Sequence, residues 1–303
     1  MSAEPRSPVS PGAPSGSADA RPARLKHFIA GLEGIALLRH WLVGDRAQAE
    51  RRFEALRRLL RSDAPGIALE PPELDVVDGY ARWAASYDGT PNPLIEVEEP
   101  VVRARIDALP PGRALDAACG SGRHTAYLCA RGHQVYGVDA SPHMLERARK
   151  RAPGADLREG DLTRLPFEDA HFDVAVCSLA LTHCADLGPP IRELARVLRP
   201  GGRLILSDQH PAMTGLGNTA LFLDAALSPA IVKSHAHLHS DYLDAFRSSA
   251  LDVRGCDEPR YTEAHLPTLL SPLPRSAHGA VTAGMLGLPA ALIWELRSSS
   301  PES

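Results

Sequence analysis

The stretch LDAACGSGRHT, residues 115–125, decides the fold class. Its first residues, up to Ala118, are small or apolar and typical of a buried strand, and the chain becomes polar and helix-forming from Arg123 onward. Gly120 and Gly122 lie between the two parts, and because they lack a Cβ they permit a tight turn and close approach of a ligand to backbone N–H groups. The helix that follows directs its positive end at the same corner. We therefore expect an anionic or strongly polar ligand there.

From this corner onward, short β-rich runs alternate with helical runs. The β-rich runs are Arg113 to Cys119, Gln134 to Asp139, Asp156 to Gly160, Phe172 to Ser178 and Arg203 to Ser207. Such alternation predicts an α/β fold with a parallel sheet wrapped by helices. The segments CDEPRYT, which contains Glu258 and Pro259, and LPAALIWELR are expected to be the last two strands, paired as an antiparallel hairpin at the sheet edge.

Composition divides the chain into four parts. Residues 1–23 are rich in Pro, Ser, Ala and Gly and predict a disordered tail, because they offer few large apolar groups to bury. Residues 24–63 carry apolar residues at helical spacing in two stretches and predict a helical hairpin. The proline-containing residues 64–79 predict a linker, and residues 80–303 the main domain.

Net charge and cysteine content limit the classes of partner and the cellular location that we expect. The formal net charge is -4 and the arginines are scattered among acids, so we expect no nucleic-acid partner. Five cysteines without a CxxC pair favour a reducing cytoplasm over a disulfide framework or a structural zinc site. The longest apolar stretch, around Gly284 to Trp294, contains Pro289 and is shorter than the ~20 residues that span a bilayer. We therefore expect a cytoplasmic protein that does not enter the membrane.

The second strand indicates what the ligand contains. Its sequence, VYGVDAS, ends in Asp139, about 20 residues after the glycine corner. A carboxylate at this place can accept hydrogen bonds from two ribose hydroxyls. A dinucleotide would favour a third glycine where Thr125 stands, which weakens the alternative of a nicotinamide-dependent oxidoreductase. A non-catalytic binding scaffold is the other alternative.

Four motifs carry a resemblance to a known enzyme family. They are LDAACGSGRHT, VDASPHM, EGDLTRLPF and ELARVLRPGGRLILSD, each at the carboxyl end of an expected strand or in the turn after it. In order and spacing they resemble the class I S-adenosylmethionine (SAM)-dependent methyltransferases, over roughly Tyr80 to Arg297. The resemblance implies SAM as the cofactor. It also implies a Rossmann-like, doubly wound seven-stranded sheet, mostly parallel with an antiparallel last strand, to which the N-terminal helices are an extension.

The resemblance further implies residues for the methionine part of SAM. Gly120 and Gly122 would lie against it, and Asp116 would be oriented toward its amino group, directly or through water. Ser178, at the end of the fourth strand, would offer its carbonyl to the same amino group. Arg123 departs from the commonest motif, and its fork of donors suits the SAM carboxylate.

The nucleoside part would be held by residues of the next two motifs. Asp139 would bind the ribose diol, and Asp161 with the backbone of Leu162 would bind the adenine edge. Met144 would lie against the adenine face. Met144 and Leu162 are also apolar residues of the kind that any helix or turn buries, so ordinary packing is the alternative for these two.

An aromatic segment, YARWAASYD, precedes the main motifs. In similar enzymes this segment folds over the cofactor, and the rings of Tyr80, Trp83 and Tyr87 could cover the cation and exclude water. We assign Tyr87 to the cofactor and Tyr80 and Trp83 to the substrate. For Trp83, a role as a core anchor for the N-terminal helix is the equal alternative.

Histidine is the residue type best suited to remove an acceptor proton, since it titrates near neutrality. His183 in LALTHC follows the fourth strand, where a structural role is the alternative, and His210 in SDQHP ends the fifth. His237 belongs to the triplet His235, His237 and His239, which would share one face of an extended segment. No Cys or carboxylate cluster accompanies the triplet in sequence, so we expect no metal.

An insertion at about residues 210–240 forms the substrate lid in similar enzymes. Between Pro211 and Lys233 this insertion is rich in Ala, Leu and Gly, with Phe222 as its only aromatic residue. Such a composition favours a small, largely apolar acceptor. Tyr242, which follows the insertion, is expected to contact the substrate. The resemblance favours O-methylation of a small molecule of secondary metabolism, with N- or C-methylation as the alternatives. The N-terminal helices could pair two copies into a homodimer.

Overall fold

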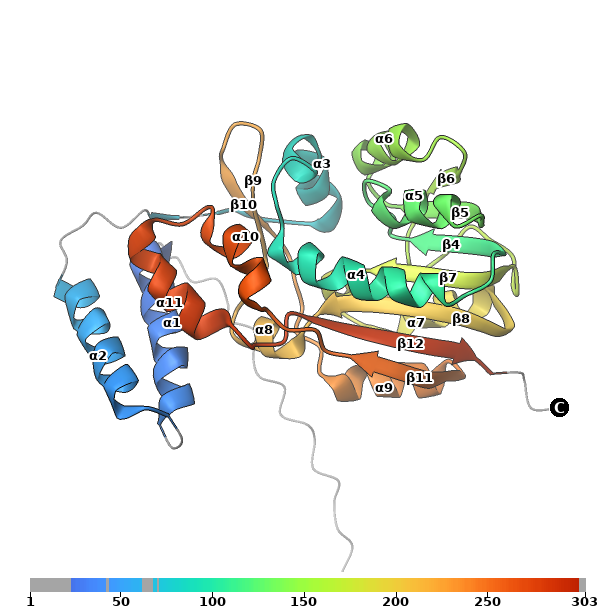
Figure 1. Ribbon diagram of the computed structural model, residues 1–303. Helices are drawn as coiled ribbons and strands as arrows, with labels where there is room; N and C mark the ends of the chain where they lie inside the picture. The colour runs from blue at the N-terminus through green and yellow to red at the C-terminus, as the bar shows by residue number, and fades with distance from the viewer. Residues whose placement is uncertain (1–22, 42–43, 62–67, 70, 300–303) are drawn as a thin grey trace, which may run out of the picture.

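A computed structural model of the chain describes residues 23–41, 44–61, 68–69 and 71–299. Its centre is a seven-stranded sheet of order β11-β12-β8-β7-β4-β5-β6 (Figure 1). The strands are β4 (Arg113–Ala117), β5 (Gln134–Asp139), β6 (Asp156–Glu159), β7 (Phe172–Ser178), β8 (Leu198–Gln209), β11 (Leu251–Asp257) and β12 (Ala291–Ser298). Neighbours pair in parallel except β12, which is antiparallel to both β11 and β8. This confirms the predicted doubly wound, mostly parallel sheet.

Helices cover both faces of the sheet because the central strands are apolar on both sides. Helices α4 (Pro93–Asp107) and α5 (Arg123–Ala130) pack on Val174 and Val176 of β7. Helices α7 (Gly188–Val197) and α9 (His239–Ser248) pack on Ala175 and Cys177 of the same strand. Each Leu or Ile fully buried in these layers contributes about 1.5–3 kcal/mol. The two layers hold the carboxyl ends of β4, β5 and β7 in fixed relative positions.

The last two strands pair antiparallel at the sheet edge, as expected, but a long connection joins them in place of a hairpin turn. β11 is the edge strand, and β12 lies inside the sheet between β11 and β8. Glu258 and Pro259 follow β11 instead of belonging to a strand, and the connection to β12 contains α10 (Leu266–Leu270) and α11 (Arg275–Met285). These helices bury Leu269, Ala277, Ala280 and Val281 against the N-terminal part of the chain. Local sequence patterns do not predict such a contact between distant segments.

The N-terminal helices α1 (Leu25–His40) and α2 (Arg46–Arg61) occupy the region where a helical hairpin was expected (Figure 1). Ile29 and Leu32 of α1 are buried with α11. Two residues of the expected linker form β3 (Glu73–Leu74), and α3 (Val76–Tyr87) begins four residues before the expected start of the main domain. The short strands β1 (Ala23–Arg24) and β2 (Ala68–Leu69) pair with each other. The predicted tail lies, apart from Ala23, outside the described residues.

The lid follows β8 and packs on α3. It comprises α8 (Pro211–Gly215) and the strands β9 (Ala220–Leu223) and β10 (Pro229–Val232), which join β3 in a three-stranded sheet. Phe222 and Val232 are buried in a cluster with Tyr80 and Trp83 of α3. The lid and α3 therefore form one unit beside the carboxyl ends of the main strands.

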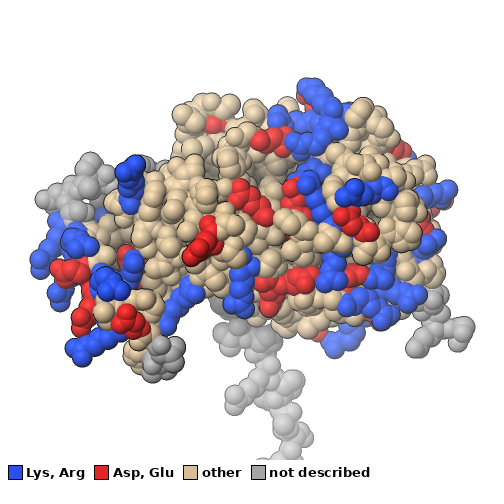
Figure 2. All heavy atoms as spheres, in the orientation of Figure 1, with Lys and Arg blue, Asp and Glu red and all other residues tan. Residues whose placement is uncertain are grey.

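The face shown in Figure 2 mixes basic and acidic side chains. Many charged groups of the described residues are paired, as Arg196 is with Glu193 at 2.7 Å and Arg131 with Asp107 at 2.5 Å. Among the described helices, none has the length and apolar content needed to cross a bilayer.

Candidate active site

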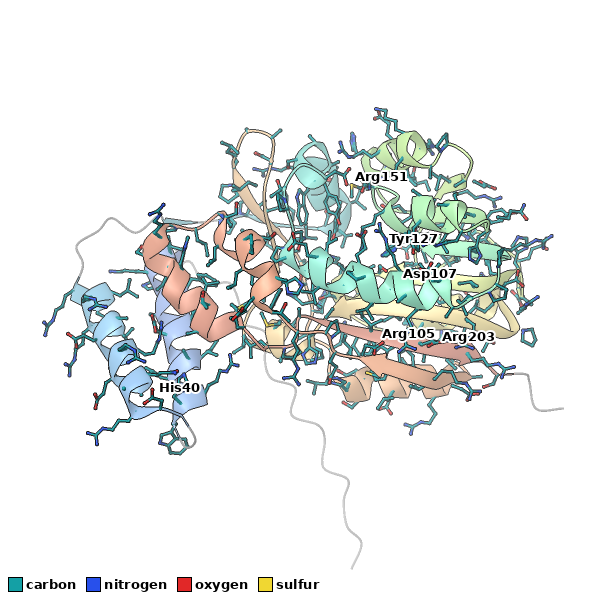
Figure 3. All side chains as sticks on the ribbon, in the orientation of Figure 1. His40, Arg105, Asp107, Tyr127, Arg151 and Arg203 are labelled. Carbon is teal, nitrogen blue, oxygen red and sulfur yellow. The ribbon has the colours of Figure 1, made fainter. Side chains whose placement is uncertain are left out.

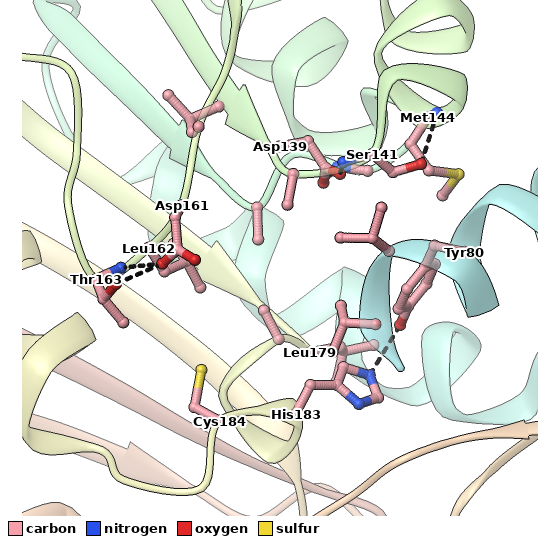
Figure 4. Close-up of a pocket in the computed structure, with 18 of the residues that line it drawn as sticks. Tyr80, Asp139, Ser141, Met144, Asp161, Leu162, Thr163, Leu179, His183 and Cys184 are labelled. Carbon is pink, nitrogen blue, oxygen red and sulfur yellow. Dashed lines mark hydrogen bonds between the residues drawn. The ribbon is translucent and has the colours of Figure 1, made fainter. Parts of the chain in front are cut away.

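A cavity of about 380 Å³ lies at the carboxyl ends of β4, β5 and β7 (Figure 4). Its walls come from α3, from α6 (Pro142–Arg151) and from the loops that follow the strands. Of the residues predicted for the site, ten line it: Tyr80, Tyr87, Gly120, Arg123, Asp139, Met144, Asp161, Leu162, Ser178 and His183. The cavity therefore lies where open α/β sheets bind ligands.

The two glycines of the corner have different physical roles. Gly120 has φ 54° and lines the cavity, and a Cβ there would meet only Met144 Cε, at 3.6 Å. Gly122 has φ 83° and is not among the lining residues, and a Cβ there would lie 2.9 Å from Ala148 Cα of α6. Gly122 is thus required for the packing of α5 against α6, whereas Gly120 leaves space for a ligand. Gly122 was expected beside the methionine part of SAM, but it does not line the cavity.

Asp139 at the end of β5 holds the corner and faces the cavity. Its Oδ2 accepts a hydrogen bond from the N–H of Gly120 at 2.8 Å, and its Oδ1 accepts one from the N–H of Ser141 at 2.9 Å. Burial raises the pKa of Asp139, and the two N–H groups oppose that rise. Each oxygen keeps acceptor capacity for a ligand hydroxyl. Ser141, the N-cap of α6, accepts from the N–H of Met144 and also lines the cavity.

The loop after β6 forms the opposite wall. Asp161 Oδ1 accepts from the N–H and the hydroxyl of Thr163 at 2.6 and 2.7 Å, which fixes the carboxylate. Figure 4 shows Asp139 and Asp161 across one cavity, with Met144 and Leu162 beside them. Carboxylates and apolar side chains in this arrangement suit a ribose and an aromatic base.

Two further polar residues of the lining are Ser178, the last residue of β7, and Arg123, the first residue of α5. Ser178 has a buried hydroxyl with no hydrogen-bond partner among the described residues. Arg123 places Nη1 2.8 Å from Glu98 and 3.4 Å from Glu99, while the residue still lines the cavity. Asp116 differs from the expectation, because it is buried below the corner, accepts from Thr125 Oγ1 at 2.6 Å and does not line the cavity.

The end of α3 is tied to the corner and to α6. Asp88 accepts from the hydroxyl of Ser121 at 2.8 Å and forms ion pairs with Arg147 at 2.8 Å and Arg151 at 3.0 Å. Figure 3 labels Arg151 between α3 and α6. This network holds α3, and with it Tyr80, against the cavity.

Tyr80 and His183 form a hydrogen-bonded pair on the cavity wall. The Tyr80 hydroxyl lies 3.0 Å from His183 Nε2, and His183 Nδ1 lies 2.8 Å from the carbonyl oxygen of Lys233. A carbonyl oxygen only accepts, so Nδ1 carries the proton and Nε2 accepts from the Tyr80 hydroxyl. Burial lowers the pKa of His183 and raises the pKa of Tyr80 well above its ordinary value. Near neutral pH the pair is thus an uncharged phenol and an uncharged imidazole.

Two aromatic residues predicted to contact substrate lie outside the cavity lining. Trp83 stacks on Phe222 of β9, with ring centroids 4.7 Å apart and planes 9° from parallel. It is therefore the anchor between α3 and the lid. Tyr242 is 2% exposed and donates its hydroxyl to Asp208 at 2.8 Å in the layer below the sheet. Burial raises the pKa of Asp208 to about 7.

His210 also lies outside the cavity lining, where it caps α8. His210 and His239 place Nε2 3.0 and 2.8 Å from Glu258 Oε1, and the three ligand atoms lie within 4.8 Å of one another, as in a metal site. However, the N–H of Ala212 donates to His210 Nδ1 at 3.0 Å, so the ring proton is on Nε2 and points at the carboxylate. A metal would need the lone pair of that Nε2. The arrangement is a hydrogen-bonded clamp between α8, α9 and the end of β11.

His237 does not line the cavity either. Its Nε2 lies 2.8 Å from the carbonyl oxygen of Cys184. The lining residues that the sequence did not single out are mostly small or apolar: Val76, Val77, Ala118, Leu179, Ala180, Cys184, Ala185 and Pro189. These residues lie in turns or at helix starts. Of the segments that contain them, the sequence identified only the turns after β4 and β7 as parts of the site. Glu98, which holds Arg123, gave no signal because it is one acid in a mixed helix.

Comparison with known proteins identifies the family. Residues 115–206 match the methyltransferase domain family. A 2-phytyl-1,4-naphtoquinone methyltransferase from Synechococcus elongatus is 31% identical over 193 residues, which are 60% of this chain and 79% of that protein. The chain belongs to the class I SAM-dependent methyltransferases. This confirms the identification made from the four motifs, and with it SAM as the cofactor.

Other methyltransferases match over fewer residues or at lower sequence identity. A malonyl-acyl-carrier-protein O-methyltransferase from Serratia marcescens is 34% identical over 132 residues, which are 44% of this chain and 51% of that protein. The chain spans about half the length of several curated relatives that it matches. The crystal structure of a SAM-dependent methyltransferase from Mesorhizobium loti aligns with a TM-score of 0.51 at 24% identity, over 66% of this chain and 97% of that one, and shows the shared methyltransferase fold.

The cavity of this methyltransferase is the candidate site for SAM. The hydroxyl of Ser178 has no hydrogen-bond partner among the described residues, and the Arg123 guanidinium, which also belongs to a lining residue, is paired with Glu98. Asp139 and Asp161 line the same cavity, and Gly120 leaves open space beside it.

Proposed function

We propose that this protein transfers a methyl group from SAM to an oxygen of a small, uncharged and largely apolar acceptor. The observation that carries the proposal is the Tyr80–His183 pair, an uncharged proton acceptor on the wall of the cavity that fits SAM. When bound, SAM supplies a methyl group on a sulfonium, which a nucleophile displaces in line. The chain's own residues then have to align the acceptor, exclude water and take up its proton.

The pair can accept a proton although neither of its members is charged. An acceptor hydroxyl donates its hydrogen bond to the Tyr80 oxygen, and the Tyr80 proton moves to His183 Nε2 as the acceptor proton moves to Tyr80. The resulting imidazolium keeps its Nδ1 proton on the carbonyl of Lys233. Solvent removes the proton afterwards, so the net products are the methyl ether, S-adenosylhomocysteine and one proton.

The charges around the cavity favour an uncharged acceptor. Three acids, Asp139, Asp161 and Asp186, line it, while Arg123 is the only Lys or Arg among the described lining residues and is already paired with Glu98. A carboxylate or phosphate acceptor would meet repulsion without a free cation to balance it. The naphthoquinone named in the Synechococcus relative is an uncharged ring of the kind we propose, whereas the malonyl group of the Serratia relative carries a carboxylate.

Methyl transfer from labelled SAM to a panel of acceptors tests the proposal. We expect neutral phenols and hydroquinones to be labelled and matched benzoates to be inert, and NMR of the product to show an O-methyl group. A C-methyl or N-methyl product would overturn the oxygen assignment. Calorimetry should show binding of SAM and S-adenosylhomocysteine but not of NAD, and binding without transfer to any acceptor would favour a scaffold.

We further propose that two copies pair through α1 and α2. Large apolar side chains are exposed on these helices or at their ends, among them Leu38 at 74%, Trp41 at 78%, Phe53 at 56% and Leu60 at 67%. A second copy is the partner expected from such a surface. Light scattering should give twice the mass of the chain, and Trp41→Ser with Phe53→Ser should halve it. A monomeric wild type would refute the pairing.

A further inference from the structure

One extended segment of the lid, residues 231–237, runs from β3 to the turn that carries His183, and we call it the strap. At its start, the N–H groups of Ile231 and Lys233 each donate at 3.0 Å to carbonyls of Pro72 and Leu74. Those carbonyls immediately precede α3, whose Asp75 N-cap accepts from the N–H of Asp78. The start of the strap is therefore fixed to the helix that presents Tyr80.

The middle of the strap contacts the 3-10 turn η1 (Leu181–His183), which forms part of the cavity wall. The carbonyl of Lys233 accepts from His183 Nδ1 at 2.8 Å. Two residues later the N–H of His235 donates to the carbonyl of Thr182 at 2.7 Å, and the Thr182 hydroxyl donates to the carbonyl of His235 at 3.2 Å. The strap thus joins the elements that carry the two members of the Tyr80–His183 pair.

The end of the strap is anchored by the side chain of His237. Its Nε2 lies 2.8 Å from the carbonyl oxygen of Cys184, the residue after His183, and must carry a proton because a carbonyl only accepts. His237 as a whole is 9% exposed, and its ring lies edge-on to Tyr242, with ring centroids 6.1 Å apart. Tyr242 is itself fixed by its hydrogen bond to the buried Asp208. His237 is therefore held rigidly and away from the cavity.

We propose that His237 is a positioning residue for proton transfer. By fixing the strap to the turn that carries His183, it keeps the carbonyl of Lys233 on His183 Nδ1, and so keeps Nε2 free to accept from Tyr80. This inference rests on the proposed function. It assigns His237 an effect on the reaction without contact with the acceptor or with SAM.

The alternative tautomer explains why the anchor matters. If the carbonyl of Lys233 moved off Nδ1, the ring proton could move to Nε2, where it would point at the Tyr80 oxygen. The imidazole would then donate to Tyr80 and could no longer take up the proton of an acceptor. Loss of one hydrogen bond of ordinary strength at His237 corresponds to a loss of up to about tenfold in the competent arrangement.

The test compares His237→Leu, which removes the donor, with His237→Gln, whose amide nitrogen can replace Nε2. We expect His237→Leu to lower kcat about tenfold while KM for SAM and the affinity for S-adenosylhomocysteine stay within twofold. We expect His237→Gln to recover most of kcat. His239→Leu is the matched control, because His239 bonds to Glu258 at the protein surface and should leave kcat unchanged.

Nitrogen-15 NMR of the His183 ring gives a readout independent of turnover. The wild type should show the proton on Nδ1, and His237→Leu should show a mixture of tautomers, whereas His237→Gln should not. Wild-type kcat and an unchanged His183 tautomer in a folded His237→Leu variant would overturn the inference. His237→Asn, which keeps an amide too short to reach Cys184, gives the same test if His237→Leu does not fold. If the wild type methylated no acceptor, the proposed function would fail, while the NMR comparison would still decide whether His237 sets the tautomer.

Discussion

Replacement of Glu98 by Gln should destabilise the protein strongly, although Glu98 lies outside the cavity lining. Glu98 of α4 is fully buried, with Oε2 2.8 Å from Arg123 Nη1 and Oε1 2.6 Å from the hydroxyl of Ser207 on β8. His124 Nε2 lies 3.5 Å away. Burial opposes ionisation, but His124, Arg123 and Ser207 together hold the pKa of Glu98 at about 2.

The size of the effect follows from this pKa. The ordinary pKa of a glutamate is 4.5, so a pKa of about 2 means that the folded state favours the carboxylate by about 3 kcal/mol. A lowered pKa stabilises the fold fully above the unfolded value, and that stabilisation is lost as the pH falls from 4.5 through 2. The variant with Gln cannot ionise, so we expect it to be about 3 kcal/mol less stable than the wild type at neutral pH, with about half of that gap at pH 3.

Urea unfolding followed by circular dichroism at both pH values measures this gap. Glu99→Gln is the matched control. The Glu99 side chain is 24% exposed, contacts Arg103 at 3.0 Å and lies 3.4 Å from the same Arg123 that Glu98 contacts, so its replacement should cost less than about 1 kcal/mol. A Glu98→Gln variant within about 0.5 kcal/mol of the wild type at neutral pH would refute the reasoning, because surface substitutions already differ by that much. A gap that did not shrink with acid would refute it as well.

Three further predictions concern the cavity. Asp139→Asn should weaken S-adenosylhomocysteine binding at least tenfold in calorimetry, because the ribose loses a charged acceptor, and unchanged affinity would remove the ribose assignment. His183→Gln should lower kcat about a hundredfold with little change in that affinity, and the acid limb of wild-type kcat should lie below the ordinary histidine pKa of 6.5, because burial lowers the pKa of His183. A limb above that value would contradict the base assignment. Gly122→Ala should lower the unfolding free energy by about 1–3 kcal/mol, whereas Gly120→Ala should mainly weaken cofactor binding; the reverse order would contradict the roles given to the two glycines.

The sheet could be predicted from the sequence because its central strands are buried on both faces. β4, β5 and β7 are short apolar runs that end in polar or small residues, so Gly120, Asp139 and Ser178 could be placed at one sheet edge. The connection between β11 and β12 was missed for a physical reason. The apolar residues of α11 have their partners on α1, more than two hundred residues earlier in the chain, and local periodicity carries no record of such a partner.

Some of the site residues could be predicted from the sequence and others could not. Asp139 and Asp161 could be predicted because a motif fixes their distance from a strand end. The histidines could not be ranked, since the sequence does not show which ring nitrogen meets a donor and which meets an acceptor. His210 Nδ1 accepts from the N–H of Ala212, so His210 caps α8. His183 Nδ1 donates to the carbonyl of Lys233, so the lone pair of its Nε2 is available to the Tyr80 hydroxyl.

The position of β12 between β11 and β8 has a consequence for synthesis of the chain. β12 pairs with β8 over residues 203–209 and with β11 over residues 251–257, and β11 has no other strand partner in the described sheet. A ribosome releases the N-terminal segments first. The nascent chain can therefore assemble β4 to β8 and the cofactor corner early, but β11 stays unpaired until the final strand emerges and inserts beside it. Stop codons or slow translation before Ala291 would leave two open strand edges, which makes this late stage the point at which the nascent protein is most exposed to aggregation.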